Sequence, residues 1–260
     1  MKSTPAALAL AAALSSPLMA LAADTVVLGQ ADIVGIKLGM KLDEALAKLK
    51  AANPGFEIKT QQLNVAPGKP AFTHALHADT SKEPREQIHV GITMPPEEQR
   101  VWSVYRQVSF QGQEQELGQL LAALRGKYGS EMYLRRDQSY PVLQWAHDQA
   151  GNALPAQVIQ QCGGWFGDMR IGSYQQLYRP PGGGALSRQL IPCYTADYLT
   201  IALFPADQNK QLVRTMSVQI ESGGLYAAQM TKTRDWLTQL QQQGSDADVQ
   251  RAKAQAKPKL

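Results

Sequence analysis

Apolar residues recur at helical spacing in two stretches of the N-terminal half of the chain. Between Leu42 and Leu49 they fall at i, i+3, i+4 and i+7, the stripe of an amphipathic helix, and Asn53-Pro54-Gly55 supplies a stop. The same spacing returns between Leu117 and Tyr128, and Gly129 follows as a C-terminal signal. We therefore predict one helix over each stretch.

Two alternating segments lie between these helices. From Ile88 to Met94, apolar residues alternate with polar or small ones, which is the period of a half-buried strand. A second strand is predicted from Trp102 to Phe110, after the turn-forming sequence Pro95-Pro96-Glu97-Glu98. The two strands should pair as a hairpin.

The order strand, turn, strand, helix returns in the C-terminal half. We predict strands over residues 198–204 and 212–220, with turn-forming residues between them at 205–209. A helix is predicted over residues 226–243. Matching elements are offset by about 108 to 110 residues. We interpret this order as a duplication with halves 23–130 and 131–243. One irregular domain is the alternative, and whether the halves form one sheet or two stays open.

Antiparallel hairpins backed by helices predict the α+β class, with helices packed on one face of the sheet or sheets. After the last predicted helix, residues 244–260 contain almost no large apolar side chain and end in basic residues. Such a segment buries too little surface to offset its ordering entropy, so we predict a mobile basic tail. A frayed extension of the last helix is the alternative.

The first 22 residues have the pattern of a secretory signal peptide. Lys2 precedes an apolar run, and Ala20 and Ala22 stand at the small-residue spacing of a cleavage site. The run is well short of the roughly 20 residues that a membrane-spanning helix needs. We expect cleavage near Ala22 and a mature protein in the periplasm, or secreted.

The chain has two cysteines, Cys162 and Cys193. Export places both in an oxidising compartment, which favours a disulfide bond. Closing a loop of about 30 residues stabilises a fold by roughly 3 to 4.5 kcal/mol when chain entropy dominates. No cysteine precedes Cys162, so the cleavage site lacks a thiol for a lipid anchor.

The formal net charge is +4, and the basic residues are scattered. Nucleic-acid binding needs clustered Lys and Arg, so we expect no nucleic-acid partner.

Arg106 and Arg214 stand at matching places in the two predicted hairpins, on otherwise apolar strand faces. Paired guanidinium groups can hold an acidic segment of a partner protein. The alternative is that each side chain packs its stem and keeps its head in water.

Candidate catalytic and metal-binding residues are few. His74 and His77 lie close to Asp79, and with His89 they could form a metal site, but zinc needs three or four converging ligands and a strand would point His74 and His77 to opposite faces. Gln161-Cys162-Gly163-Gly164-Trp165 resembles a papain-type signature but has Gly164 at the nucleophile position. Phosphate-loop and nucleophile-elbow motifs are absent from the sequence. We therefore predict no cofactor and no catalytic residue.

The segment from Ile33 to Ala45 resembles the Gly-Met start of small bacterial envelope domains. In these, Gly39-Met40 and an acidic residue such as Glu44 would set the loop before a helix. The SmpA/OmlA-type domain of the barrel-assembly accessory lipoprotein and the tandem-domain β-lactamase inhibitor protein are similar there. The resemblance implies helices on a small antiparallel sheet, used for binding other proteins.

We therefore expect a non-enzymatic binding or interaction module of the cell envelope. An envelope hydrolase or metal-dependent enzyme built around His74, His77 and His89 is one alternative. A carrier of a small ligand, using the aromatic residues between 165 and 178, is another. The partner and the oligomeric state stay open.

Overall fold

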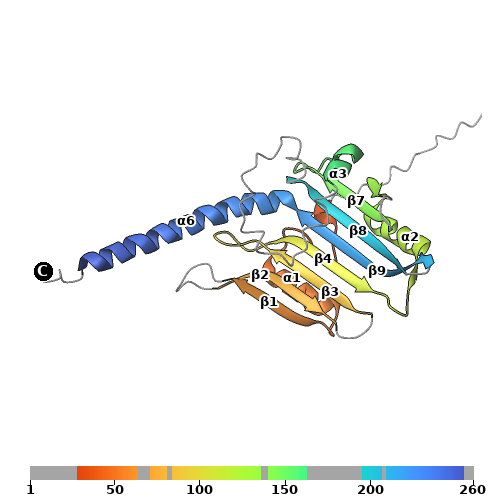
Figure 1. Cartoon of the computed structure of the whole chain (residues 1–260), viewed down its shortest axis with the longest axis horizontal. Coiled ribbons are helices and arrows are strands. Elements are labelled where there is room, and N and C mark those ends of the chain that lie inside the picture. The colour runs from red at the N-terminus through yellow and green to blue at the C-terminus, as the bar shows by residue number, and fades with distance from the viewer. Residues whose placement is uncertain are drawn as a thin grey trace, which may run out of the picture.

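The computed structural model describes residues 28–63, 71–80, 84–135, 140–162, 195–206 and 209–254, and these build an α+β fold around one antiparallel sheet. Its main strand order is β1-β2-β3-β4-β9-β8-β7-β6, and the short β5 pairs with β9 (Figure 1). The strands are β1 (Glu57–Leu63), β2 (Phe72–Asp79), β3 (Glu86–Ile92), β4 (Val101–Ser109), β5 (Gln115–Glu116), β6 (Tyr133–Arg135), β7 (Val142–His147), β8 (Asp197–Ala206) and β9 (Asn209–Ser222). The helices are η1 (Leu28–Gln30), α1 (Leu42–Ala52), α2 (Leu117–Tyr128), α3 (Ala156–Cys162) and α6 (Gly223–Ala254).

The sheet consists of two meanders joined at their last strands. β1 to β4 pair in sequence order, β6 to β9 do the same, and β4 pairs with β9. A helix precedes each meander: α1 precedes the first and α2 the second. The question that the sequence left open is thereby answered, because both halves share one sheet.

The predicted local elements are confirmed. Both hairpins form, β3 with β4 and β8 with β9, and the helices at 42–52 and 117–128 start at the predicted residues. The last helix differs from its prediction. It continues through residues 244–254, where we expected a mobile tail, and residues 255–260 lie outside the described part of the chain.

The main hydrophobic core lies between one face of the sheet and the elements η1, α1 and α2. Alternate residues of β2, β3, β4, β7, β8 and β9 point into it, among them Leu76, Val90, Val104, Ile220 and Trp145. Helix α1 contributes Ala45 and Leu49, which are fully buried. Apolar residues recur about every 3.6 positions in the helices and every second position in the strands because the helices pack on this face of the sheet.

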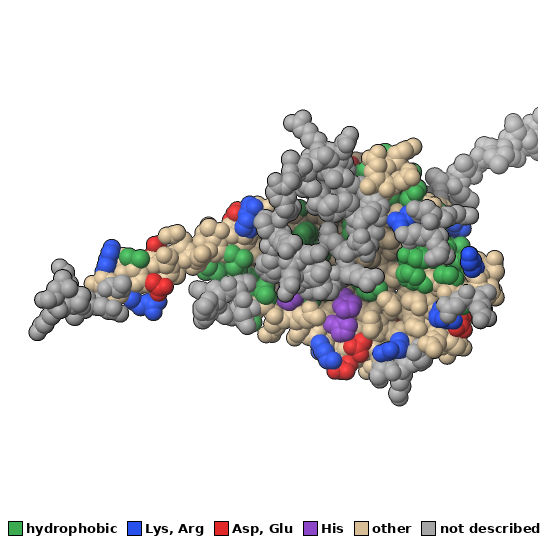
Figure 2. All heavy atoms as spheres, in the orientation of Figure 1, with side chains coloured by type: hydrophobic (Ala, Val, Ile, Leu, Met, Phe, Trp, Pro, Cys, Tyr) green, Lys and Arg blue, Asp and Glu red, His purple; other side chains and the backbone are tan. Residues whose placement is uncertain are grey.

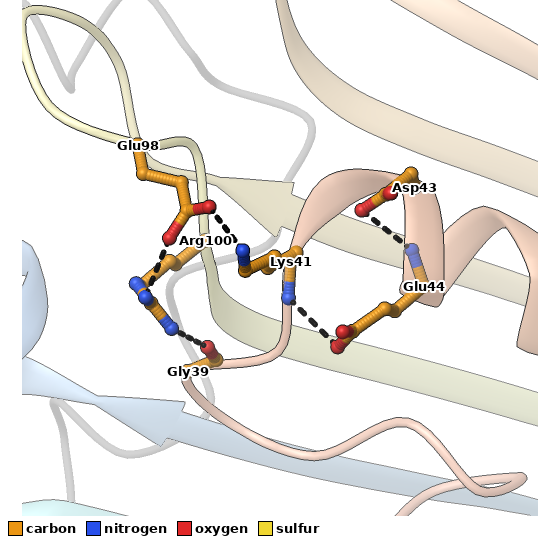
Figure 3. Close-up of polar contacts among 6 residues, drawn as sticks. All are labelled: Gly39, Lys41, Asp43, Glu44, Glu98 and Arg100. Carbon is orange, nitrogen blue, oxygen red and sulfur yellow. Dashed lines mark hydrogen bonds and ion pairs between the residues drawn. The ribbon is translucent and has the colours of Figure 1, made fainter.

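A network of polar contacts fixes the loop before α1 to the turn between β3 and β4 (Figure 3). Gly39 has φ +77°, a left-handed conformation that favours glycine, and its carbonyl accepts a hydrogen bond of 2.8 Å from Arg100 Nη1. The carboxylate of Glu98 binds both Arg100 (2.5 Å) and Lys41 (2.6 Å). At the helix start, the backbone N–H of Lys41 donates to Glu44 (3.4 Å). Gly39 and Glu44 thus have structural contacts at the places where the sequence predicted them.

Helix α6 packs on the sheet only over its first turns and then extends away from the body of the protein (Figure 1). Tyr226 stacks on Trp102 with ring centroids 4.6 Å apart, and Gln229 donates a hydrogen bond to the carbonyl of Met94 (2.6 Å). Further along, Trp236 contacts the ring edge of Phe72. Every residue from 241 to 250 is exposed. No described helix combines the length and the apolar character that a membrane crossing requires.

Several predicted features lie outside the described residues. They are the signal peptide at 1–22, Cys193, and the aromatic residues between 165 and 178, and the side chain of Cys162 is also not described. The signal peptide, the disulfide bond and the ligand-carrier alternative therefore stay predictions.

The contact between Gly91 and Trp102 yields a test of this packing. A Cβ atom at Gly91 would lie 2.8 Å from the Trp102 ring, which stacks on Tyr226 of α6. We expect Gly91→Ala to lower the free energy of unfolding by about 1 to 3 kcal/mol, because the ring must shift. Urea unfolding measures this. Gly126→Ala is the control: it has open space on α2 and should raise stability by about 0.5 to 1 kcal/mol. Equal stability of Gly91→Ala and the wild type would contradict the contact.

Candidate binding face

The sheet face opposite the main core carries a row of polar side chains that crosses six strands. The register pairs His77 with His89, His89 with Tyr105, Tyr105 with Gln219, Gln219 with Thr200, and Thr200 with Gln144. With strands spaced about 4.8 Å apart, the row is roughly 24 Å long. We call this surface the polar face. Histidine side chains reach the surface on this side of the molecule (Figure 2).

The polar face is not uniformly open to water. At the β1 to β4 end, His77, His89 and Tyr105 are half-buried. At the other end, Gln144 is 1% exposed and Thr200 7% exposed. There α3 packs on the same face through a small apolar cluster of Ile159, Ala146 and Tyr198.

Gln144 and Thr200 are buried with their polar atoms unpaired. Neither the amide nitrogen nor the amide oxygen of Gln144 has a hydrogen-bond partner, nor does the hydroxyl of Thr200. Such groups usually find a partner, and leaving one unsatisfied costs about 1 to 3 kcal/mol. The two residues are direct neighbours on β7 and β8, so donor and acceptor groups are concentrated at this point.

A buried carboxyl group lies in the next row of the polar face. Glu221 of β9 is 2% exposed; it accepts a hydrogen bond from Ser103 Oγ (3.3 Å) and also contacts Tyr198 and Gln219. Burial raises the pKa of Glu221 to about 8, against a smaller opposite effect of the Ser103 hydrogen bond. The group is therefore mainly protonated and uncharged at pH 7.

At the β2 and β3 end, three polar side chains form a chain of contacts. Asp79 Oδ2 lies 3.0 Å from His77 Nε2, and His77 Nδ1 lies 3.2 Å from His89 Nδ1. Burial, with a smaller contribution from His77, lowers the pKa of His89 to about 4. At pH 7 His89 is therefore neutral. The two rings in contact thus do not repel each other as two positive charges would.

The three histidines of the predicted metal site do not converge. His77 and His89 are cross-strand neighbours, whereas His74 is three residues before His77 on β2 and so faces the opposite side of the sheet. Burial also lowers the pKa of His74. Among the described residues, no group of three or more His, Cys, Asp or Glu side chains is arranged to hold a metal ion. The three-histidine enzyme alternative therefore loses its site.

Arg106 lies on the core face of β4, in line with Val104 and Val108, whereas Arg214 lies at a register shift of β9, between Thr215 and Val213. Arg106 forms an ion pair with Glu86 (2.6 Å), and Arg214 lies 3.8 Å from Glu114. Because Arg214 falls at this register shift, alternation along β9 does not place it on the same surface as Arg106. The predicted role of the two arginines in partner binding stays a prediction.

The buried groups of the polar face were missed by sequence reasoning. No strand was predicted at Gln144, Glu221 directly follows the predicted strand 212–220, and Thr200 is one polar residue in the predicted strand 198–204. Only the register shows that they lie in adjacent rows. A sequence signal existed for the histidines alone, since His77 and His89 occupy alternating positions of two neighbouring strands.

Chemically, the polar face presents neutral hydrogen-bonding groups at its buried end and two imidazole rings at its open end. Comparison of the chain with protein-family models, curated proteins and solved structures gave no match.

The raised pKa of Glu221 predicts a pH-dependent contribution to stability. Between the ordinary pKa of 4.5 and about 8, the folded state holds a proton that the unfolded state releases. This contribution is complete below pH 4.5 and is lost as the pH rises through 8. We expect the stability of the wild type relative to Glu221→Gln to be higher at pH 5 than at pH 9, by on the order of 2 kcal/mol.

Urea unfolding of both proteins at pH 5, 7 and 9 measures this difference. Glu57→Gln, at an exposed position of the edge strand β1, is the matched control and should show no comparable trend. A difference between wild type and Glu221→Gln that does not vary with pH would contradict the raised pKa.

The two arginines should differ in their tolerance of charge reversal. Glu86 is only 14% exposed beside Arg106, so Arg106→Glu places two carboxylates together in a partly buried site and should cost about 2 to 4 kcal/mol. Arg214→Glu, with a longer and more exposed contact, should cost on the order of 1 kcal/mol. Thermal unfolding compares them. The double variant Arg106→Glu/Glu86→Arg should recover part of the loss, and no recovery would contradict a direct pair.

Proposed function

We propose that this protein is a non-enzymatic binding module of the bacterial cell envelope that works in the periplasm and binds another envelope protein through the polar face. The sequence of residues 1–22 supports export, and the two cysteines suit an oxidising compartment. The resemblance of residues 33–45 to small envelope domains supports a binding role.

The observation that carries this proposal is the buried, unpaired state of Gln144 and Thr200. A side chain that is held away from water without a partner lowers the stability of the free protein. Such a cost persists at functional sites, where a bound partner removes it. Because Gln144 is 1% exposed, a partner can contact its amide only after the residues that cover it move aside; the amide then offers one donor group and one acceptor group, which matches a peptide group of a partner chain.

The arrangement of the sheet also supports the polar face as the binding surface. On the helix-covered face, η1, α1 and α2 pack against the strands, so that face is part of the core. On the polar face, the strands from β2 to β4 present half-buried and exposed polar side chains, including Tyr105 and Gln107. Tyrosine and histidine suit an interface because each offers both apolar area and a hydrogen-bonding group.

The first experiment is site-specific photo-crosslinking in living cells of the native host. A photoreactive residue replaces Gln107 on the polar face, and the control replaces the exposed Gln119 of α2. We expect one reproducible crosslinked envelope protein from position 107 and none from position 119. Equal crosslinking from both positions, or background proteins only, would argue against the polar face as a binding surface.

Two further substitutions test the unpaired groups themselves. Gln144→Met and Thr200→Val keep side-chain size and remove polar atoms, so the free protein should be as stable as the wild type or more stable by about 1 kcal/mol. Binding of the crosslinked partner should weaken about tenfold, as expected for lost hydrogen bonds. Lower stability with unchanged binding would show that the groups serve the fold instead.

Export is tested separately. Mass spectrometry of the protein from the periplasmic fraction should find an N-terminus at Ala23 and no free thiol at Cys162 or Cys193. A protein that keeps Met1, or that stays in the cytoplasmic fraction, would overturn the proposed location.

A further inference from the structure

The two imidazole rings at the open end of the polar face are placed unusually for a simple hydrogen bond. Their Nδ1 atoms lie 3.2 Å apart, while the ring centroids of His77 and His89 are only 4.3 Å apart and tilted by 49°. In a head-on N–H···N bond the ring radii add to the distance between the nitrogens, so the centroids would lie much further apart. The rings therefore lie partly side by side at a tilt, with their Nδ1 atoms adjacent.

The distance between the nitrogens also fits two ligands of one metal ion. Histidine nitrogens lie about 2.0 to 2.1 Å from zinc, so two of them at a tetrahedral angle are separated by about 3.3 Å. The observed Nδ1–Nδ1 distance of 3.2 Å matches this separation, but the ring centroids are 4.3 Å apart, whereas two rings on one tetrahedral ion would have centroids about 5.2 Å apart, so both rings must tilt outward when the ion binds. Because His77 and His89 are opposed on neighbouring strands, the sheet itself maintains their spacing.

Asp79 occupies the position of an outer-shell partner. Its carboxylate lies 3.0 Å from Nε2 of His77, the nitrogen that faces away from His89. Histidine ligands commonly donate their second N–H to a carboxylate, which fixes the tautomer and leaves the other nitrogen free to bind a metal. With Nε2–H donated to Asp79, the lone pair of His77 lies on Nδ1 and points toward His89.

We propose that His77 and His89 bind one divalent transition-metal ion, Cu²⁺ or Zn²⁺, through their Nδ1 atoms, with Asp79 orienting His77. His89 contributes its lone pair from Nδ1 when its own proton resides on Nε2. The described residues offer no third ligand of the His, Cys, Asp or Glu type. The remaining coordination positions are open to water or to a further donor.

The choice of metal follows from the ligands. Imidazole suits copper and zinc, whereas calcium and magnesium prefer oxygen ligands. By the order of affinities for a given nitrogen site, copper should bind more tightly than zinc, and nickel and cobalt less tightly than copper. This site does not depend on the proposed protein partner, since its ligands come from β2 and β3 alone.

The test is isothermal titration of the mature protein, produced without a histidine tag, with CuCl₂ and with ZnCl₂. We expect one ion per chain, with copper bound more tightly, and an electron paramagnetic resonance spectrum of the copper form with coupling to two nitrogens. His77→Ala and His89→Ala should each weaken binding at least about tenfold. Asp79→Asn should weaken it about 10- to 100-fold, as for other outer-shell partners.

His74→Ala is the matched control, because His74 lies on the same strand but faces the other side of the sheet. Its affinity for copper should equal that of the wild type. Circular dichroism of each variant checks the fold, and His89→Gln serves as a milder variant if His89→Ala unfolds. Absence of saturable binding, or equal binding by wild type and folded His77 and His89 variants, would overturn the proposal.

Discussion

The pairing of β4 with β9 is the constraint on which the rest of the structure depends. These strands are about a hundred residues apart in sequence, and their register from Ser103–Glu221 to Ser109–Thr215 joins two four-stranded meanders into one sheet. Because side chains alternate along a strand, this register decides which residues of the two halves share a face. A shift of β9 by one residue would move Ile220 out of the core and Glu221 into it.

The same register creates the polar face. It aligns Tyr105 with Gln219 and thereby connects the histidines of the first meander with Thr200 and Gln144 of the second. Neither half alone contains the complete row. Any partner that contacts both ends of the row would recognise the assembled sheet and not an isolated half, which is a physical reason for keeping both halves in one domain.

Local patterns predicted four strands and three helices correctly, but they did not predict β1, β5, β6, β7 or α3, nor how the elements assemble. The helical spacing from Leu42 to Leu49 indicates one buried stripe, and so does the alternation from Ile88 to Met94. The helix α1 and the strand β3 are found at these places. The burial of Glu221 and Gln144 could not be predicted, because a polar residue at an alternating position has the same pattern whether water or another element covers it. The continuation of α6 beyond Gln243 was only the alternative to a mobile tail, for a related reason. Those residues are exposed on every side, so the helix leaves no apolar stripe in the sequence.

The two ends of the polar face also differ in the groups that they can bind. At the buried end, low solvent exposure keeps Glu221 protonated and leaves neutral donors and acceptors, which suit uncharged peptide groups. At the open end, water can reach the half-buried imidazole rings and would complete the coordination of the proposed ion. A metal ion would bring positive charge to one end of a surface whose other end is neutral. A partner with an oxygen or nitrogen donor at the matching position could then occupy an open coordination site while its peptide groups meet Gln144 and Thr200, so that metal and partner would each raise the affinity for the other.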